Sequence, residues 1–186
     1  MDVLPDIEGQ HGRHYEARPV YLTNGADVAR DGALWAGRSF TVSTSIADVP
    51  AGSNLYAILA NPAGSGVDAI LYNRIFSNDL TDTDPSLFYR AHGGPTATLA
   101  NAVTVPNADI GQGPGAMTFR YEVGAVAMGG IEATGELLPR GRPYSRPLVV
   151  RMRPGVSLGF SIQGIGGGVQ SAVKLAMVFE WYEVPA

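Results

Sequence analysis

Two apolar runs separated by a short break, within residues 53–77, constrain the fold of this chain more than any other stretch. In the first run Leu55, Ala57 and Leu59 alternate with their neighbours, and a period of two residues is typical of a β-strand. The break reads NPAGSG: its proline lacks a hydrogen-bond donor and its glycines can take a positive φ, so it favours a turn. The second run, residues 67–76, is rich in β-branched and aromatic residues. We therefore expect strand, sharp turn and strand here, and no chemistry.

Alternating runs of this kind recur along the rest of the chain. The 186 residues include 24 glycines and 13 prolines, which suits tight turns between short strands. No long segment shows the 3.6-residue period of a helix, and the length suits one domain with a sizeable core. These features predict an all-β fold, an antiparallel, jelly-roll-like β-sandwich, over residues 38–186. The glycine-rich segments 64–66 and 164–168 are predicted to be hairpin turns rather than phosphate loops.

The first predicted strand of this domain covers residues 38–46. Its alternation would place Phe40, Val42, Thr44 and Ile46 on the core side and the serines and threonine between them on the other. We expect a half-buried strand.

The last predicted strand, residues 171–184, is the longest. At about 3.3 Å per residue it would reach about 45 Å, more than an ordinary strand. We expect it to be a central strand of the core sheet, with its surplus length pairing with something beyond the domain. Its odd positions are apolar throughout: Val173, Leu175, Met177, Phe179 and Trp181.

Residues 1–37 show no clean period of either kind. We interpret them as an extended N-terminal arm that packs on a neighbouring molecule through Tyr15, Tyr21 and Trp35; a disordered terminus is the alternative. The predicted domains are therefore an arm, 1–37, and a β-sandwich, 38–186. The start of the chain has no basic and apolar regions of a secretory signal.

Catalytic patterns are missing from the sequence. There is no cysteine, so disulfides, thiolate metal sites and cysteine nucleophiles are excluded. The three histidines, His11, His14 and His92, fall in no metal or nucleophile motif, and no Gly-x-Ser-x-Gly elbow is present. Glu180 and Glu183 would lie on opposite faces of the last strand, which argues against a glycosidase pair. We predict that the protein is not an enzyme and needs no cofactor.

Two charged segments are candidate binding regions. Asp79, Asp82 and Asp84 fall in one polar loop and could bind Ca²⁺, but their spacing does not match an EF-hand, so a solvated turn is the favoured interpretation and no metal site is predicted. The second segment, residues 140–153, is rich in arginine. It is a candidate contact with the acidic surface of a partner protein or with a second copy of this chain. Its candidate residues are Arg140, Arg142, Arg151 and Arg153.

Charge and hydropathy bear on the other partner classes. The formal net charge of −4 gives no field that would attract nucleic acid or an anionic membrane. No window approaches the roughly 20 apolar residues of a membrane-spanning helix. We predict neither nucleic-acid nor membrane binding.

Residues 38–186 resemble small β-sandwich proteins of tailed-phage virions, such as capsid decoration, head-fibre and tail-associated proteins. The resemblance is carried by LYAILANPAGSGVDAILYNRIFS, residues 55–77, and by the ending PGVSLGFSIQ…AVKLAMVFEWYEVP. It implies a structural protein of the virion, assembled in the host cytoplasm, that decorates or stabilises the capsid or forms a head-fibre base. A homotrimer is the implied assembly, bound to capsid or other virion proteins. The resemblance does not cover residues 1–37.

The alternative interpretation is a carbohydrate- or receptor-binding sandwich of a tail or adhesin protein. Its site would use an exposed loop aromatic such as Tyr89 together with the carboxylates of residues 79–84. An enzyme would instead require His92 to lie beside a carboxylate or a hydroxyl in the folded chain.

Overall fold

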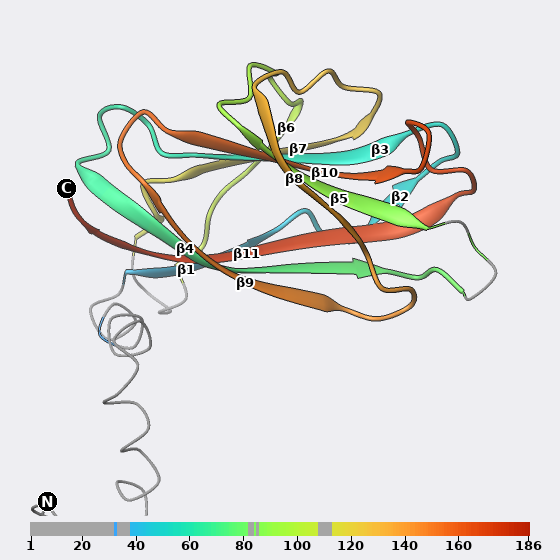
Figure 1. Cartoon of the computed structure of the whole chain (residues 1–186). Coiled ribbons are helices and arrows are strands. Elements are labelled where there is room, and N and C mark those ends of the chain that lie inside the picture. Colours follow the sequence, from blue (N-terminus) through green and yellow to red (C-terminus); the bar gives the residue numbers. More distant parts are fainter. Residues whose placement is uncertain (1–31, 33–37, 82–83, 85, 108–112) are drawn as a thin grey trace, which may run out of the picture.

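The computed structural model describes residues 38–81, 84, 86–107 and 113–186, together with Gly32. These residues form two antiparallel sheets packed face to face, an all-β sandwich (Figure 1). The predicted arm, residues 1–37, lies outside the described part except for Gly32, and with it Tyr15, Tyr21 and Trp35. The strands are β1 (Ser39–Ser43), β2 (Ala47–Val49), β3 (Asn54–Ala60), β4 (Val67–Asn78), β5 (Leu87–Gly93), β6 (Asn101–Val103), β7 (Thr118–Gly124), β8 (Ile131–Leu137), β9 (Tyr144–Met152), β10 (Ser157–Gly164) and β11 (Val173–Pro185).

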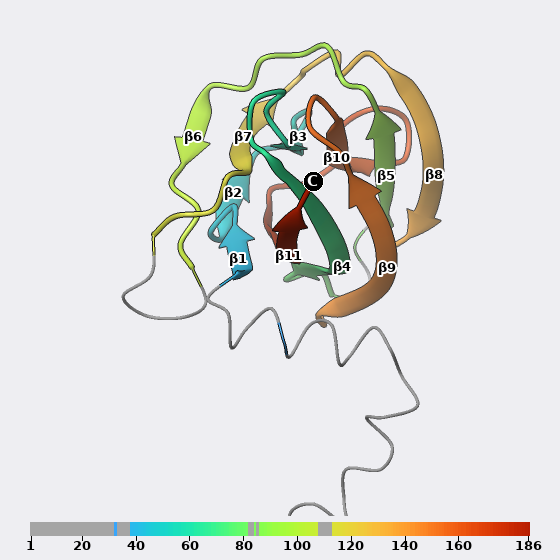
Figure 2. The same cartoon turned by 90° about the vertical axis from the view of Figure 1, so that its left-hand side faces the viewer.

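The strand order is that of a jelly roll. One sheet, called sheet A, has the order β1-β11-β4-β9, with β2 also paired to β11. The other, sheet B, has the order β6-β7-β3-β10-β5-β8. Without β2, β6 and β7, the eight remaining strands run 1-8-3-6 in sheet A and 2-7-4-5 in sheet B, the two interlocked Greek keys of the jelly roll. Figure 2 shows the two layers and β6 at the outer edge of sheet B.

The turns predicted as hairpins are not hairpins. Residues 61–66 join β3 of sheet B to β4 of sheet A, and residues 165–172 join β10 of sheet B to β11 of sheet A. The strands on either side of each turn therefore pair with other strands. A strand-turn-strand pattern does not distinguish a hairpin from a crossing between layers, and in a sandwich the crossing brings two apolar faces together.

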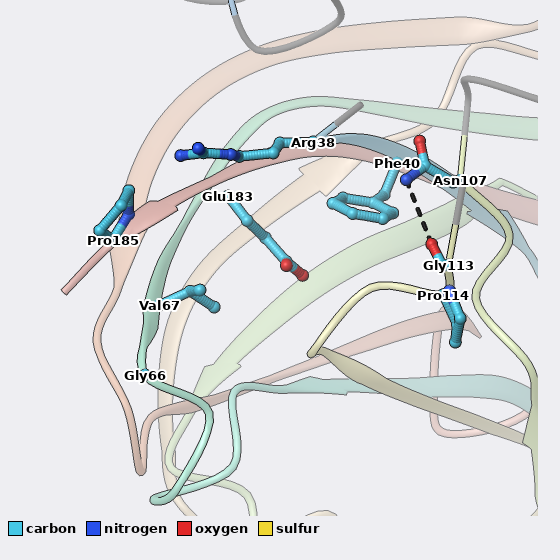
Figure 3. Close-up of a pocket in the computed structure, with 9 residues that line it drawn as sticks. All are labelled: Arg38, Phe40, Gly66, Val67, Asn107, Gly113, Pro114, Glu183 and Pro185. Carbon is cyan, nitrogen blue, oxygen red and sulfur yellow. Dashed lines mark hydrogen bonds between the residues drawn. The ribbon is translucent and has the colours of Figure 1, made fainter. Parts of the chain in front are cut away.

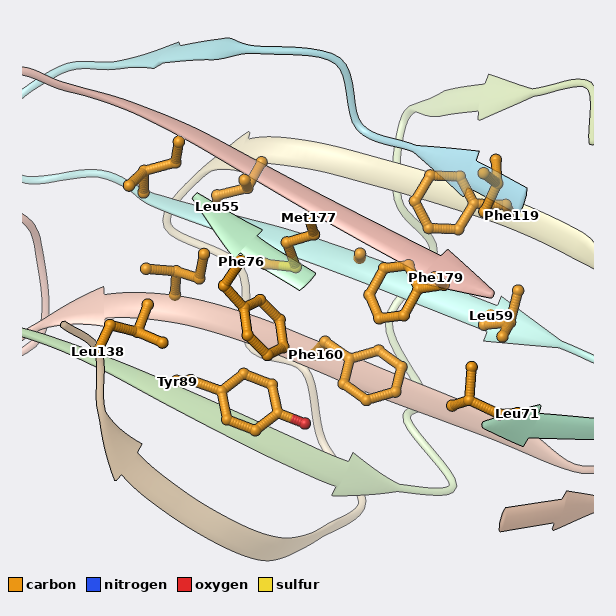
Figure 4. Packing of buried hydrophobic residues seen from close by; sticks show 14 of the residues in the cluster. Leu55, Leu59, Leu71, Phe76, Tyr89, Phe119, Leu138, Phe160, Met177 and Phe179 are labelled. Atoms are coloured by element: carbon orange, nitrogen blue, oxygen red, sulfur yellow. The ribbon is translucent and has the colours of Figure 1, made fainter. Parts of the chain in front are cut away.

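The core between the sheets is rich in aromatic rings (Figure 4). The ring centroids of Phe160 and Phe179 lie 4.6 Å apart, and those of Phe76 and Tyr89 lie 4.2 Å apart. Every apolar odd-numbered residue predicted for the last strand is buried, from Val173 to Trp181. This confirms β11 as a central strand.

The surplus length of β11 is used inside the domain, which corrects the expectation of an outside partner. The strand pairs with β4 over Leu175–Pro185 and, on its other side, with β2 and then β1. Two short strands therefore share one long edge.

The first predicted strand is interrupted, and Ile46 does not face the core. Ser45 has a positive φ of 58°, and β1 ends before it at Ser43. The Thr44 hydroxyl accepts a hydrogen bond from the Met177 amide at 3.1 Å, which keeps Thr44 buried. The irregular backbone rotates the next side chain outward, so Ile46 is 74% exposed.

A second, smaller apolar cluster covers part of the outer face of sheet B. Tyr56 of β3 packs there with Leu99 and Met128, which belong to the long excursion between β5 and β8. The excursion covers the outer face of β3, so Tyr56 is buried as well as Leu55 and Ala57, whose side chains face the core.

Strand β9 begins at Tyr144, inside the arginine-rich segment. Pro147 is tolerated because β9 is an edge strand, paired on one side only, and the partner strand has a bulge between Leu71 and Asn73.

Among the described residues no helix is long and apolar enough to cross a membrane.

Candidate functional site

The outer face of sheet A carries apolar side chains that do not belong to the core. Ile70 lies opposite Tyr182, and Ile75 lies opposite Val178, across the β4–β11 pair. Both isoleucines are only half buried, and Val149 on the edge strand β9 is 68% exposed. Apolar side chains that gather on the outer side of a sheet, away from the core, are typical of a surface that contacts another chain.

Polar side chains on this outer face form hydrogen bonds with one another. Asn73 donates to Glu180 at 2.9 Å and accepts from the Ser145 hydroxyl at 2.9 Å. The rings of Tyr72 and Tyr182 stack with their centroids 6.1 Å apart. The face is therefore an ordered surface that joins three strands of sheet A.

Arg151 is the one predicted arginine that the structure places beside this face in an ion pair. Its guanidinium pairs with the Asp68 carboxylate, which is 3% exposed, while Arg151 itself is 58% exposed. Arg153, the residue that follows β9, is also exposed, as is Val149 within the strand.

The remaining predicted arginines lie elsewhere. Arg140 donates to the Ser86 hydroxyl at 3.1 Å, before the first residue of β5 in sheet B. Arg142 is exposed in the turn between β8 and β9. The structure therefore divides the arginine-rich segment between a turn and a strand, and each part contacts a different element.

The acidic loop forms turn contacts. Asp84 accepts hydrogen bonds from the amide and hydroxyl of Thr81, at 2.7 and 2.8 Å. The hydrogen bond from the Thr81 amide lowers the pKa of this exposed carboxyl group. Asp79 accepts from the Lys174 amide at 2.8 Å. Asp82 is outside the described residues, and among those described there is no group of three or more metal-binding side chains.

Tyr89 is buried in the core, not exposed in a loop, which removes it from the carbohydrate-binding alternative. It is 1% exposed, because Leu87, Tyr89 and Ala91 form the inward row of β5. A run as short as residues 87–90 does not show which of its side chains face the core.

His92 is close to a hydroxyl. Its Nε2 lies 3.2 Å from Ser161 Oγ, which also accepts a hydrogen bond from Gln163 at 3.0 Å. Ser161 is fully buried beneath its neighbours, so in this structure the hydroxyl has no access to a substrate. Glu132, on the next strand, forms an ion pair with Arg90 at 2.8 Å.

Glu183 is the candidate whose environment the sequence reasoning missed, because it was considered there only as the partner of Glu180. It continues the inward row of β11 after Trp181 and is 6% exposed, whereas Glu180 faces outward as predicted. Its Oε1 atom accepts hydrogen bonds from the amides of Ala116 and Met117, at 2.9 and 3.3 Å, and from the Trp181 indole at 3.3 Å. The signal was available: a carboxylate at an inward position of a strand is unusual and has to be held by partners.

A pocket of about 380 Å³ opens beside this carboxylate (Figure 3). It lies where β1 begins and β11 ends, and the start of β4 and the segment before β7 complete its walls. Its lining residues are Arg38, Phe40, Gly66, Val67, Asn107, Gly113, Pro114, Glu183 and Pro185.

No protein-family model, curated protein or solved structure matches the chain. A sandwich hosts many unrelated functions, so function has to be inferred from the surfaces of this particular fold.

Proposed function

We propose that this chain is a structural protein of a tailed-phage virion or a phage-like particle. It decorates or stabilises the capsid, or forms the base of a head fibre, as a homo-oligomer, with a trimer favoured. The observation that carries the proposal is the group of apolar side chains on the outer face of sheet A, Ile70, Ile75, Val149 and Val178, which lie apart from the core between the sheets.

The fold supports this role by analogy. The jelly roll is a common architecture of viral capsid domains, although it also occurs in lectins and other proteins. The sequence resemblance of residues 55–77 and of the chain's ending points to the same class of proteins.

The outer face supplies the physical reason for self-association. Ile70, Ile75 and Val178 would leave water on contact with a second copy, and burying apolar area contributes about 25 cal/mol per Å². An obligate interface buries well above about 1,000 Å² in total. Residues 1–37 join the sandwich at β1, on the edge of sheet A, and we assign them the attachment to the particle.

The solution mass of the full chain, measured by light scattering coupled to gel filtration, tests the assembly. A stable species near three times 19.5 kDa is expected. A monomer that persists at high protein concentration would remove the homo-oligomer and with it the use proposed for the outer face.

Attachment is tested separately. Deleting residues 1–37 should leave a folded sandwich that no longer binds the particles of its phage, measured by co-sedimentation. A truncated chain that still decorates particles would contradict the role of the arm.

A further inference from the structure

The pocket at the end of the sandwich contains a buried carboxylate with a free oxygen. All three hydrogen bonds of Glu183 within the described residues go to Oε1, and Figure 3 shows the carboxyl group pointing into the pocket. In the part of the chain that the structure describes, no basic side chain forms an ion pair with it. A negative charge removed from water is most stable beside a cation that also donates hydrogen bonds.

We propose that this pocket binds an arginine or lysine side chain of a protein, with the cationic group at Oε2 of Glu183. The walls match such a ligand, because Val67, Pro114 and Pro185 offer apolar contacts for the methylene stem behind the charge. The volume of about 380 Å³ is in the range of pockets that hold small ligands.

Other ligand classes fit the pocket less well. A sugar ring would need an aromatic face to stack on, and Phe40 is 3% exposed with its ring packed on Trp181. A divalent metal would need several oxygen ligands, and Glu183 is the only carboxylate among the lining residues described.

Arg38 is the other charged group at the pocket. Figure 3 shows its guanidinium directed away from the Glu183 carboxyl group, so it leaves the space at Oε2 open. Its positive charge lies at the rim, where solvent screens it more strongly than the buried carboxylate. Binding of a basic side chain in this pocket is a separate proposal, and it does not depend on the proposed role in a virion.

The test uses the fluorescence of Trp181, whose indole contacts Glu183 directly. The full chain carrying Trp35→Phe leaves Trp181 as its sole tryptophan. The probes are N-acetyl-arginine amide and the neutral, nearly isosteric N-acetyl-citrulline amide. The arginine probe should bind at least about tenfold more tightly than the citrulline probe, since only arginine carries the positive charge that forms an ion pair with the carboxylate.

Glu183→Gln keeps an acceptor for the Ala116 and Met117 amides but removes the charge, so it should abolish the preference for arginine. Glu180→Gln, on the outer side of the same strand, is the matched control and should leave the preference intact. If Glu183→Gln disturbs folding, the comparison of the two probes in the chain that retains Glu183 still tests the proposal.

The basic side chain could come from residues 1–37 of the chain itself or from a partner. Replacing Arg13, Arg18 and Arg30 by Gln separates these sources, because removing an internal occupant should tighten binding of the arginine probe at least about tenfold. Unchanged binding assigns the ligand to a partner. Three results would overturn the proposal. The two probes could bind equally well, or neither could bind to the parent chain or to the chain that lacks Arg13, Arg18 and Arg30. The preference for arginine could also survive Glu183→Gln in a folded chain.

Discussion

The Nη1 atom of Arg74 donates a hydrogen bond to the hydroxyl of Tyr89 inside the hydrophobic core, and the guanidinium lies over the tyrosine ring, 5.2 Å from its centroid. Both side chains are almost fully buried, at 3% and 1% exposure. Burial lowers the pKa of Arg74 because it disfavours the charged form. Within the described part of the chain, the Nε atom of Arg74 has no hydrogen-bond partner. The core therefore contains a cation that depends on one phenol.

Replacing Tyr89 by Phe should destabilise the fold by about 1–3 kcal/mol, because it leaves a second donor of the buried guanidinium without a partner. Arg74→Met should cost less or even stabilise, since an apolar side chain of similar size needs no partner. The double variant should resemble Arg74→Met, so that the two effects are not additive. Urea unfolding of the four chains measures this; a Tyr89→Phe chain as stable as the parent would contradict it.

Tyr89 also predicts how stability changes in alkali. Burial, opposed by the nearby Arg74 charge, raises the pKa of Tyr89 from 10.0 to about 12. Between these values the unfolded chain loses the phenolic proton while the folded chain keeps it, so stability falls as pH rises. The loss should be about 1 kcal/mol by pH 11 relative to pH 8. The free energy of unfolding is measured as a function of pH for the parent and for Tyr89→Phe, which has no phenolic proton at this position. If it falls equally steeply with pH in both chains, the alkaline loss of stability does not come from Tyr89.

His92 predicts a loss of stability in mild acid. Burial lowers its pKa below the usual 6.5, an effect opposed by Glu132 and reinforced by Arg90. Below that value the unfolded chain binds a proton that the folded chain does not, so stability should fall as pH drops from 7.5 to 5. His92→Gln should show a shallower fall over the same range in urea unfolding. A variant that follows the parent curve would assign the acid sensitivity to other groups.

Much of the sandwich could be predicted from local patterns. The inward row of β11 was predicted correctly, because burial on one face imposes a period of two. What failed depends on contacts between distant residues. The exposure of Ile46 follows from the positive φ of Ser45, and the burial of Tyr56 follows from a cover formed by Leu99 and Met128.

The candidate sites were harder to predict than the strands. Sequence indicated an arginine-rich segment, but not that Asp68 pairs with Arg151 across the sheet. The pocket at Glu183 brings together residues from opposite ends of the chain, Arg38 and Pro185, which no local pattern connects. Only the carboxylate itself, in an otherwise apolar row, indicated that the end of β11 differs from the rest.

Gly130 should be the most sensitive glycine of the β5–β8 excursion. Its φ is +72°, and a Cβ there would lie 2.4 Å from the carbonyl oxygen of Gly93 and 2.7 Å from that of Gly94. Gly130→Ala therefore combines backbone strain of about 1–3 kcal/mol with a clash against main chain that cannot move aside. Gly64→Ala, in a turn where the added Cβ meets nothing within 4 Å, is the control and should change stability by less than about 0.5 kcal/mol. Equal thermal stabilities of the two variants would contradict the crowding at Gly130.

The outer face of sheet A predicts which substitution disrupts self-association. Val149 is 68% exposed on β9, so Val149→Asp costs little in the isolated sandwich but would place a carboxylate in the proposed interface, where an unpaired charge is strongly unfavourable. We expect it to shift the chain to monomer in light scattering at concentrations where the parent is oligomeric. Ile131→Asp is the matched control, because Ile131 is 78% exposed on β8, at the edge of the other sheet, and should leave the mass unchanged. If Ile131→Asp dissociates the oligomer and Val149→Asp does not, the interface belongs to sheet B, and the outer face of sheet A needs another occupant.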